Sequence, residues 1–344
     1  MTTGLQVREA TTVRQPVARH FLMCPPTFFD VVYRINPWMD PDHPVDRPRA
    51  LRQWERLVRS YRAAGHRVDL LDPVPGLPDM VFAANGATVV DGRVLAARFA
   101  TAERAPEADH HRAWHRRHPD ARTPPDGTGR GLPGGPPTAP AVQEAVAVNE
   151  AEGDFAVLAD RVLAGHGFRT SRDAHDELAR LTGRPVVSLE LVDQYLYHLD
   201  VALAVLDDRR DHIAYHPPAF SAESQALLAE LFPDALLADA ADVACLGLNA
   251  VSDGARVWLA RGADHLCGLL VGAGYTPVEV DLSELRLGGG GVKCCTQEIR
   301  PSRPGGPPDP VPPGVLLTPA HPTDPHPDPT ADHRGPRPGG LLPC

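Results

Sequence analysis

The sequence predicts an α/β fold built from a repeated unit. In three places a segment with helical spacing of apolar residues ends near a glycine and is followed by a short apolar strand. A unit that recurs in this way indicates internal pseudo-symmetry, with helices packed against sheets. The three units lie at residues 51–71, 171–191 and 263–282.

The first unit begins with a helix whose apolar face is formed by Leu51, Trp54, Leu57, Val58 and Tyr61. Gly65 ends this helix, and residues 68–71 form the strand that follows it.

The second and third units repeat the order. Ser171 is a suitable N-cap for a helix that ends at Gly183, before a buried strand at 185–191. The helix at 263–272 ends near Gly274 and precedes a strand at 277–282. Two further apolar runs are expected to be strands: 201–206, and the run that Asn85 closes.

Composition and length limit the class of protein. The chain has 344 residues, of which 42% are hydrophobic, enough for a substantial core, and a formal net charge of -10, which argues against a nucleic-acid partner. No apolar run is long enough for a membrane span and no signal peptide is recognisable, so we expect no membrane partner and a cytoplasmic location. The six cysteines form neither a disulfide framework nor a zinc motif, and no metal or other cofactor is expected.

The distribution of proline predicts the domain organisation. Residues 301–344 hold 15 of the 38 prolines and are expected to form a disordered tail. A second Pro/Gly-rich segment, at about 119–145, is expected to be a loop or insertion. One folded domain at 18–300 is left, preceded by an N-terminal extension at 1–17.

A cysteine after a glycine turn is the strongest candidate for chemistry. Residues 288–291 are four glycines, and Cys294 and Cys295 follow them closely. Glycine permits close approach of the backbone to a ligand, and a thiolate in an exposed, electropositive setting is a nucleophile. Two buried structural cysteines after a loop would produce the same pattern, and that alternative stays open.

His198 and Asp200 form a second candidate pair. At the start of the strand expected at 201–206, side chains two residues apart face the same way. A histidine with a carboxylate on one face suits proton transfer and cation binding, although a structural histidine is the alternative.

Three further polar groups have two interpretations each. The acids of 149–155 are a site or a solvated turn, and Asn85 is a ligand or a turn residue. The histidines of segment 110–118 have spacing that allows one helical face, so they could bind a metal, but a solvated cluster is the simpler expectation. These histidines are His110, His111, His115 and His118.

Taken in order, these motifs resemble the guanidino-group modifying superfamily of penteins, which includes arginine deiminases, dimethylarginine dimethylaminohydrolases, amidinotransferases and arginine dihydrolases. The resemblance covers about 18–300. It implies a five-bladed α/β propeller of ββαβ units around a central substrate site. The matching segments are MCPPTFFDVVYRINPWM (23–39), LPDMVFAANGA (77–87), EAEGDF (150–155), GHGFRT (165–170), YHLD (197–200) and GGGVKCCT (289–296).

The resemblance assigns roles to individual residues. Cys294 corresponds to the nucleophile and His198 to the general acid/base, while Glu150 and Asp200 hold the guanidinium. Cys295 is expected on the opposite face of a strand from Cys294, and the Lys293 side chain is expected to point away from the Cys294 thiol. The other substrate-binding residues implied are Asn36, Asn85, Asp154, Arg169 as the ligand of the α-carboxylate, and Arg98 as a weaker second one.

The chain departs from the family pattern in two places. Ala151 stands where relatives have glycine, which leaves Glu152 as a rival to Glu150. The Pro/Gly-rich segment replaces a helix–strand connection, so either that unit is altered or the loop bulges away from an intact site.

The implied activity is hydrolysis of the guanidino group of arginine or a methylated arginine, through a thiouronium on Cys294. Asn36 and Asn85 favour the dihydrolase type, which yields ornithine; citrulline is the product of the deiminase and dimethylargininase types. An amidinotransferase, or a non-catalytic pentein that binds a partner, remains an alternative. The expected partner is a small guanidino substrate, and the sequence leaves a homo-oligomer open.

Overall fold

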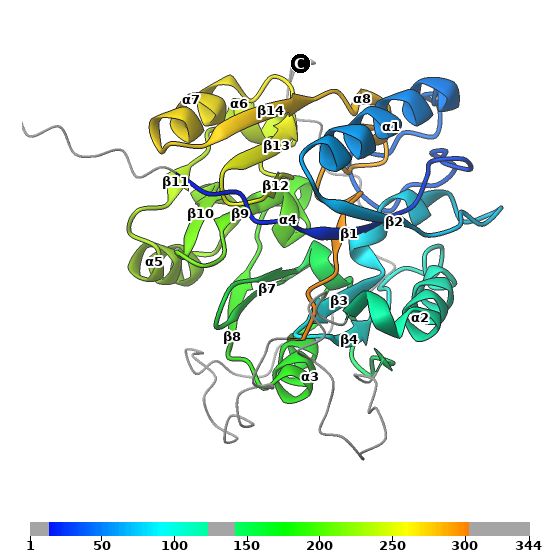
Figure 1. The fold of residues 1–344 in the computed structure, drawn as a ribbon, viewed down its shortest axis with the longest axis horizontal. Coiled ribbons are helices and arrows are strands. Elements are labelled where there is room, and N and C mark those ends of the chain that lie inside the picture. The colour runs from blue at the N-terminus through cyan, green and yellow to red at the C-terminus, as the bar shows by residue number, and fades with distance from the viewer. Residues whose placement is uncertain (1–13, 123–141, 303–344) are drawn as a thin grey trace, which may run out of the picture.

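The computed structural model describes residues 14–122 and 142–302. Within these ranges the strands form five separate three-stranded sheets. In each sheet two strands pair antiparallel, and the middle one also pairs parallel with a strand reached through a helix. Figure 1 shows α1, α2, α3, α5 and α7 at the periphery, with the strands toward the middle.

Four of these ββαβ units follow one another along the chain. The units are β3 (Ala87–Val90), β4 (Arg93–Ala96), α2 (Glu107–Arg117) and β5 (Val142–Gln143); β6 (Phe155–Val157), β7 (Val162–His166), α3 (Arg172–Thr182) and β8 (Val186–Glu190); β9 (Leu203–Asp207), β10 (His212–Tyr215), α5 (Ala222–Leu231) and β11 (Leu236–Leu237); β12 (Val251–Ser252), β13 (Arg256–Ala260), α7 (Asp264–Gly272) and β14 (Thr276–Val280).

The fifth unit joins the two ends of the described chain. Its elements are β15 (Gln297–Glu298), β1 (His20–Met23), α1 (Arg47–Ala63) and β2 (Arg67–Leu70). Phe21 of β1 lies opposite Glu298 in an antiparallel pair and opposite Val68 in a parallel one. Because β15 follows the glycine–cysteine segment directly, this pairing anchors that segment to the start of the chain.

The helices that the sequence predicts form, and glycine ends them. Asp46 caps α1 by accepting a hydrogen bond from the Arg49 amide at 2.9 Å, and Gly65 beyond α1 has φ +89°. Gly183 ends α3 in the left-handed conformation. The buried face of α1 includes Ala50 rather than Leu51, which is exposed.

Three local predictions were wrong. The run before Asn85 is two turns of 3₁₀ helix, η1 (Pro78–Val81) and η2 (Ala83–Asn85), and not a strand. The strand expected at 201–206 starts at Leu203, after the short helix α4 (Leu199–Ala202). The segment 292–295 is a turn, so Cys294 and Cys295 do not alternate along a strand. In each case the segment is apolar because it is buried. A short apolar run does not by itself distinguish a strand from a helix or a turn.

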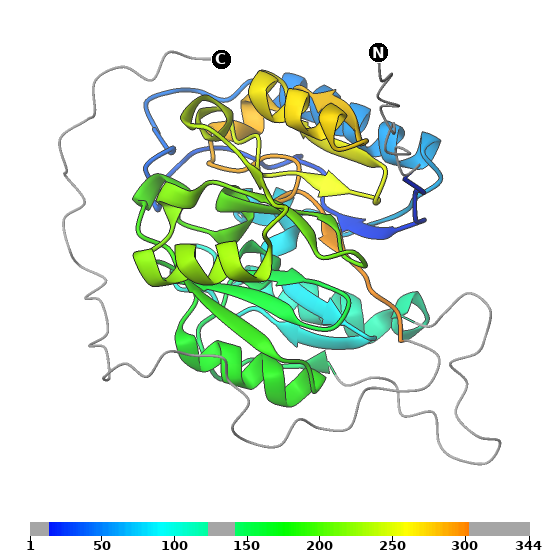
Figure 2. The same cartoon turned by 90° about the vertical axis from the view of Figure 1, so that its left-hand side faces the viewer.

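The remaining short elements lie in the connections between these strands and helices, some within a unit and some between units. They are α6 (Ala240–Ala244), α8 (Ser283–Arg286), η3 (Pro119–Arg122), η4 (Ala151–Gly153), η5 (Gln194–Leu196) and η6 (Pro217–Ala219). Figure 2 shows the same arrangement from the side.

The segment expected to be an insertion leaves its sheet complete. Val94 of β4 pairs parallel with Val142 of β5, so the unit that contains α2 keeps all three strands. This pairing agrees with a loop that leaves the site intact. Most of the segment itself, 123–141, and the expected tail from 303 onward lie outside the described residues.

The last residues of the expected N-terminal extension contact the body. The Val17 amide donates to the Asp253 carbonyl at 2.8 Å, and the Arg14 guanidinium lies 3.6 Å from the centre of the Tyr275 ring. Among the described residues, no helix has the length and apolar character that a bilayer crossing requires.

Candidate active site

Glycines bring the cysteine segment close to the core. Gly289 has φ +85°, a conformation that side chains other than glycine rarely adopt. A Cβ at Gly290 would lie 2.4 Å from the Phe82 ring, so only glycine fits there. The turn therefore places the Cys294 thiol inside the protein, where the residue is 3% exposed.

Asn249, a residue that the sequence did not single out, holds this turn. Its Oδ1 accepts from the amides of Gly291 and Cys294, both at 3.1 Å. Its Nδ2 donates to the Cys294 Sγ and to the Asp200 carbonyl, again at 3.1 Å. Asn249 thus fixes the thiol relative to the chain that carries Asp200. A lone asparagine ahead of a short strand gave no sequence signal of this role.

The Cys294 thiol donates to a carboxylate. Its Sγ lies 3.1 Å from Oδ2 of Asp200, while Oδ1 of Asp200 is buried without a hydrogen-bond partner. Burial and the Asp200 carboxylate raise the pKa of Cys294 well above its ordinary value. Burial likewise raises the pKa of Asp200. The thiol is therefore neutral at pH 7 until a cation arrives beside it.

His198 pairs with Glu150 rather than with Asp200. Its Nε2 lies 2.8 Å from Oε2 of Glu150 and 4.0 Å from Oδ2 of Asp154. Burial alone lowers the pKa of His198, but the Asp154 and Glu150 carboxylates outweigh it and raise that pKa. These residues were expected to share a strand face, but they lie at a helix start: His198 directly precedes α4 without capping it through its side chain, and Asp200 lies within α4.

The two carboxylates beside His198 differ in the direction of their pKa shifts. Burial alone would raise the pKa of Glu150, but Arg169 and His198 hold it well below its usual range. For Asp154, burial raises the pKa to about 6 in spite of His198. Asp154 also accepts from the Leu199 amide at 3.0 Å, which orients the chain next to His198.

Glu150 and Glu152 lie in different surroundings, which separates the two rivals. Glu152 forms ion pairs with Lys293 and Arg300 and accepts from the Glu298 amide. Glu152 lines a cavity of about 60 Å³. The Lys293 side chain, which was expected to point away from Cys294, is turned toward Glu152. Ala151, between the two acids, has φ +51°, which explains why a glycine suits this position better.

A small cavity joins the candidate residues. It has a volume of about 10 Å³, room for about one water molecule. Cys294 and His198 line it, together with Asn36, Asn85, Arg104, Arg169 and Tyr197 among others. A substrate can enter only if some of these side chains move.

Arg169 is engaged in this structure and does not point free into the cavity. Its NH1 donates to both oxygens of Glu150 at 3.1 Å, and its guanidinium lies 4.9 Å from the centre of the Tyr197 ring. The Tyr197 hydroxyl accepts from Asn36 Nδ2 and donates to the Gly289 carbonyl, each at 3.2 Å. Arg169 thus occupies the carboxylate expected to hold the substrate guanidinium.

The second arginine of the cavity is Arg104, not Arg98. Arg98 is exposed, is absent from the cavity lining and donates to the Val146 carbonyl. Arg104 is buried, and its NH1 donates to Oδ1 of Asn85 at 2.9 Å. The sequence singled out Arg98 and not Arg104, because neither arginine stands in a distinctive motif.

The histidines of α2 form no metal group among the described residues, and two of them contradict the expectation of a solvated cluster. His111 and His115 are fully buried. Burial lowers the pKa of each to about 3, so both are neutral. His110 and His118 lie nearer the surface.

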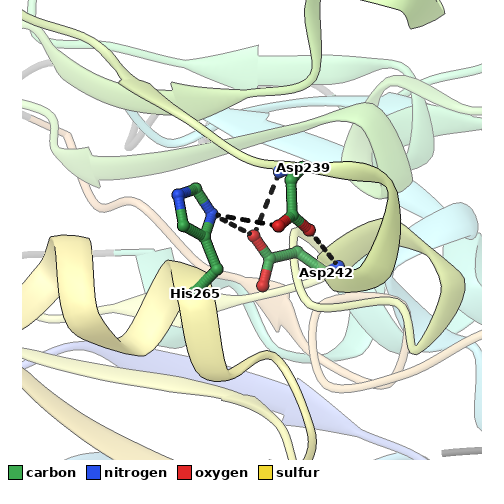
Figure 3. A group of neighbouring side chains, drawn as sticks. All are labelled: Asp239, Asp242 and His265. Carbon is green, nitrogen blue, oxygen red and sulfur yellow. Dashed lines mark hydrogen bonds and ion pairs between the residues drawn. The ribbon is translucent and has the colours of Figure 1, made fainter.

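Within the described ranges, the group that does have metal-ligand geometry is Asp239, Asp242 and His265 (Figure 3). Its carboxylates already serve as helix caps. Asp239 accepts from the Asp242 amide at the start of α6, and Asp242 accepts from the Asp239 amide and from the Leu266 amide in α7. Two helix N-termini, which repel cations, meet at this cluster.

Comparison with known proteins identifies the family. No protein-family profile matches the chain. The chain is 48% identical over 288 residues to an N(G),N(G)-dimethylarginine dimethylaminohydrolase of Mycobacterium tuberculosis, which covers 84% of this chain and 88% of the relative. The chain belongs to the guanidino-group modifying superfamily of penteins. It is a hydrolase that acts on carbon–nitrogen bonds in linear amidines, which sets aside the non-catalytic alternative.

A second group of relatives has a different activity in its name. The chain is 32% identical over 281 residues to ArgZ of Synechocystis, a bifunctional arginine dihydrolase/ornithine cyclodeaminase. The match covers 81% of this chain but 37% of ArgZ. A crystal structure of the N-terminal domain of an ArgZ variant, covalently bound to a reaction intermediate, superposes with a TM-score of 0.73 at 29% identity and covers 82% of this chain and 98% of that domain.

Proposed function

We propose that the protein is an arginine dihydrolase that converts arginine to ornithine, with Cys294 as nucleophile and His198 as general acid/base. The observation that carries the proposal is that Cys294 and His198 line the same cavity, Cys294 bonded to Asp200 and His198 paired with Glu150. Nucleophile, proton carrier and carboxylates thus meet at one point.

The first half of the reaction follows from this geometry. A guanidinium that binds between Glu150 and Asp200 brings positive charge to the thiol and favours the thiolate. The sulfur attacks the guanidino carbon, His198 protonates the departing nitrogen, and ammonia leaves. Water activated by His198 then adds to the thiouronium, and the thiolate is released from citrulline.

The second half consumes citrulline before it leaves. The thiolate attacks the ureido carbon, a second ammonia leaves, and water hydrolyses the thiocarbamate to a carbamate. The carbamate decomposes to ornithine and carbon dioxide, so one arginine and two waters give ornithine, two ammonia and one carbon dioxide. Asn85 supports this route because an amide can donate to a neutral ureido oxygen, whereas an aspartate cannot.

Substrate binding requires Arg169 to release Glu150. The arriving guanidinium would replace the Arg169 guanidinium on that carboxylate, which leaves Arg169 free for the substrate α-carboxylate. Arg104 is the second cation in the cavity lining and supports the same role. Asn36 and Asp154 would keep Tyr197 and the α4 start in place through the bonds described above.

We also propose that the five sheets are the blades of a five-bladed propeller that spans about 18–300. Five ββαβ units, one of them closed by pairing of β15 with β1, support this arrangement. The position of Cys294 between units, held by Asn249 and Asp200, is consistent with a central site.

Dimethylarginine hydrolysis is the second candidate, favoured by the 48% identity to the mycobacterial relative. Purified protein should be incubated separately with arginine carrying ¹³C at the guanidino carbon, with asymmetric dimethylarginine and with citrulline, beside Cys294→Ser as control. We expect labelled carbon dioxide and ornithine from arginine. Labelled citrulline as sole product, or dimethylamine release that outpaces arginine turnover, would reassign the activity, and turnover only with an added amine would indicate an amidinotransferase.

A further inference from the structure

Arg104 is held by a fully buried acid on the next helix. Its Nε and NH2 donate to the two oxygens of Glu107 at 3.1 and 2.8 Å, and NH2 also lies 3.3 Å from the Asp79 carbonyl. The guanidinium carbon lies 4.7 Å from the centre of the Phe99 ring. A forked, doubly bonded guanidinium has little freedom to turn, so its NH1 has a fixed direction.

That fixed direction determines how Asn85 lies. An arginine can only donate, so the Asn85 atom that faces NH1 at 2.9 Å must be the amide oxygen. The Asn85 Nδ2 then faces the Glu150 carbonyl, an acceptor, at 3.3 Å. The Asn85 amide could be placed in two ways, with its oxygen and nitrogen exchanged. The donor Arg104 and the acceptor carbonyl of Glu150 both favour the same placement.

The amide nitrogen fixed in this way lies beside the proton carrier. A Cβ at Gly153 would be 2.3 Å from Asn85 Nδ2 and 3.2 Å from Nδ1 of His198, so both side chains lie against this glycine. Nδ2 has two hydrogens, and the Glu150 carbonyl accepts one of them. Asn85 and His198 also line the same cavity.

We infer that the Arg104–Glu107 ion pair determines the product of the reaction by directing the Asn85 amide hydrogen toward the ureido oxygen of bound citrulline. The inference rests on the proposed dihydrolase activity. Glu107 is a positioning residue because it is absent from the cavity lining and acts through Arg104 and Asn85. Without the pair, Asn85 loses its donor, citrulline is held less well, and it leaves before the second attack.

Glu107→Gln is the variant that tests this role, since it keeps the size of the side chain but removes the charge and one of the two oxygens that accept from Arg104. Burial raises the pKa of Glu107 to about 7 against the opposing effect of Arg104, so assays at pH 8 keep the wild-type pair ionised. With guanidino-labelled arginine we expect the ratio of citrulline to ornithine to rise about tenfold, the effect of losing one charged hydrogen bond. Arginine consumption should change by less than about threefold.

Asp91→Asn is the matched control. Asp91 is the carboxylate partner of Arg184, another buried arginine, and neither residue lines the cavity. This control should leave the product ratio unchanged even if it lowers stability. If Glu107→Gln does not fold, Glu107→Asp replaces it, because the shorter side chain keeps the charge but holds the two-pronged guanidinium less well.

Each outcome decides one question. An unchanged ratio of citrulline to ornithine in a folded Glu107→Gln protein would overturn the inference. If the KM for arginine also rose in that case, Arg104 would serve only to bind the α-carboxylate. A wild type that releases citrulline alone would instead overturn the proposed dihydrolase activity.

Discussion

Two clusters in this protein each combine a histidine with two carboxylates, and they serve different ends. His198 lies between Glu150 and Asp154, all three of them buried. His265 lies beside Asp239 and Asp242, but its side chain is 47% exposed. The residue types are alike, so their chemistry depends on burial and on what else the carboxylates bind.

The carboxylates of the two clusters also differ in their hydrogen-bond partners. At the cluster of Asp239, Asp242 and His265, backbone amides take up the carboxylate oxygens as helix caps. At the candidate active site, Cys294, His198 and Arg169 line one cavity, and Asp200, which accepts from Cys294, keeps a buried oxygen without a partner. A cluster whose oxygens already accept from the backbone stabilises the fold, whereas one with unused acceptors can bind a cation.

The largest expected effect separates the two adjacent cysteines. Cys294→Ala should lower kcat by at least about 10⁴-fold because it removes the nucleophile. Cys295→Ser should keep most of the activity, since Cys295 packs in the buried core cluster and is not in the cavity lining. Mass spectrometry after treatment with a haloacetamidine should find the adduct on Cys294; an adduct on Cys295 alone would reverse the assignment.

The histidines of the two clusters provide the next test. His198→Ala should lower kcat by about 10²- to 10⁴-fold, the usual contribution of a general acid/base. His265→Ala should leave kcat and KM unchanged. Steady-state kinetics on both variants check this expectation, and equal losses would show that the two clusters are not functionally distinct.

The pKa of Cys294 predicts how the site reacts with alkylating reagents. Because burial and Asp200 raise that pKa, alkylation by neutral iodoacetamide should be slow at pH 7 and should accelerate as pH rises beyond the ordinary range of a thiol. A cationic chloroacetamidine should react at least about tenfold faster at pH 7, because its charge favours the thiolate. Equal rates for the two reagents at pH 7 would contradict the proposed activation by substrate charge.

The capping cluster should affect stability instead of turnover. Asp242→Ala removes the acceptor of two amides and should lower the free energy of unfolding by about 1 to 2 kcal/mol. Denaturant unfolding measures this loss, and kcat per folded molecule should stay at the wild-type value. Asp239→Asn keeps an N-cap and is the matched control; a comparable loss there would point to charge and not capping.

The smallest effect is a pH dependence of stability from His265. The hydrogen bond to Asp242 raises the pKa of His265, so the protonated form is favoured in the folded state. Its contribution to stability is therefore full below the ordinary histidine pKa and is lost as pH rises through the raised one. Comparing wild type with His265→Gln at pH 5 and pH 9 should show a difference at the lower pH alone.

Much of the site was predictable because its motifs are local. The glycine turn before Cys294, the pair His198 and Asp200, and the acids after residue 148 stand within short segments. The structure brings Cys294 into contact with Asp200, and His198 into contact with Glu150. The helix–glycine–strand units were also predictable, since periodicity and a glycine at a helix end are local signals. These features established the α/β class and the family from sequence.

Other features depend on contacts between distant segments. Asn249 bonds Cys294 across 45 residues, and Arg104 was overlooked in favour of Arg98 because burial, not sequence, distinguishes the two arginines. The backbone at Asn85 and at 292–295 follows packing rather than strand periodicity. The sequence by itself determined which residue types were available for chemistry; only the tertiary structure decided that Glu150 pairs with His198 while Glu152 pairs with Lys293 and Arg300, since a partner that neutralises a buried charge is chosen by proximity in space.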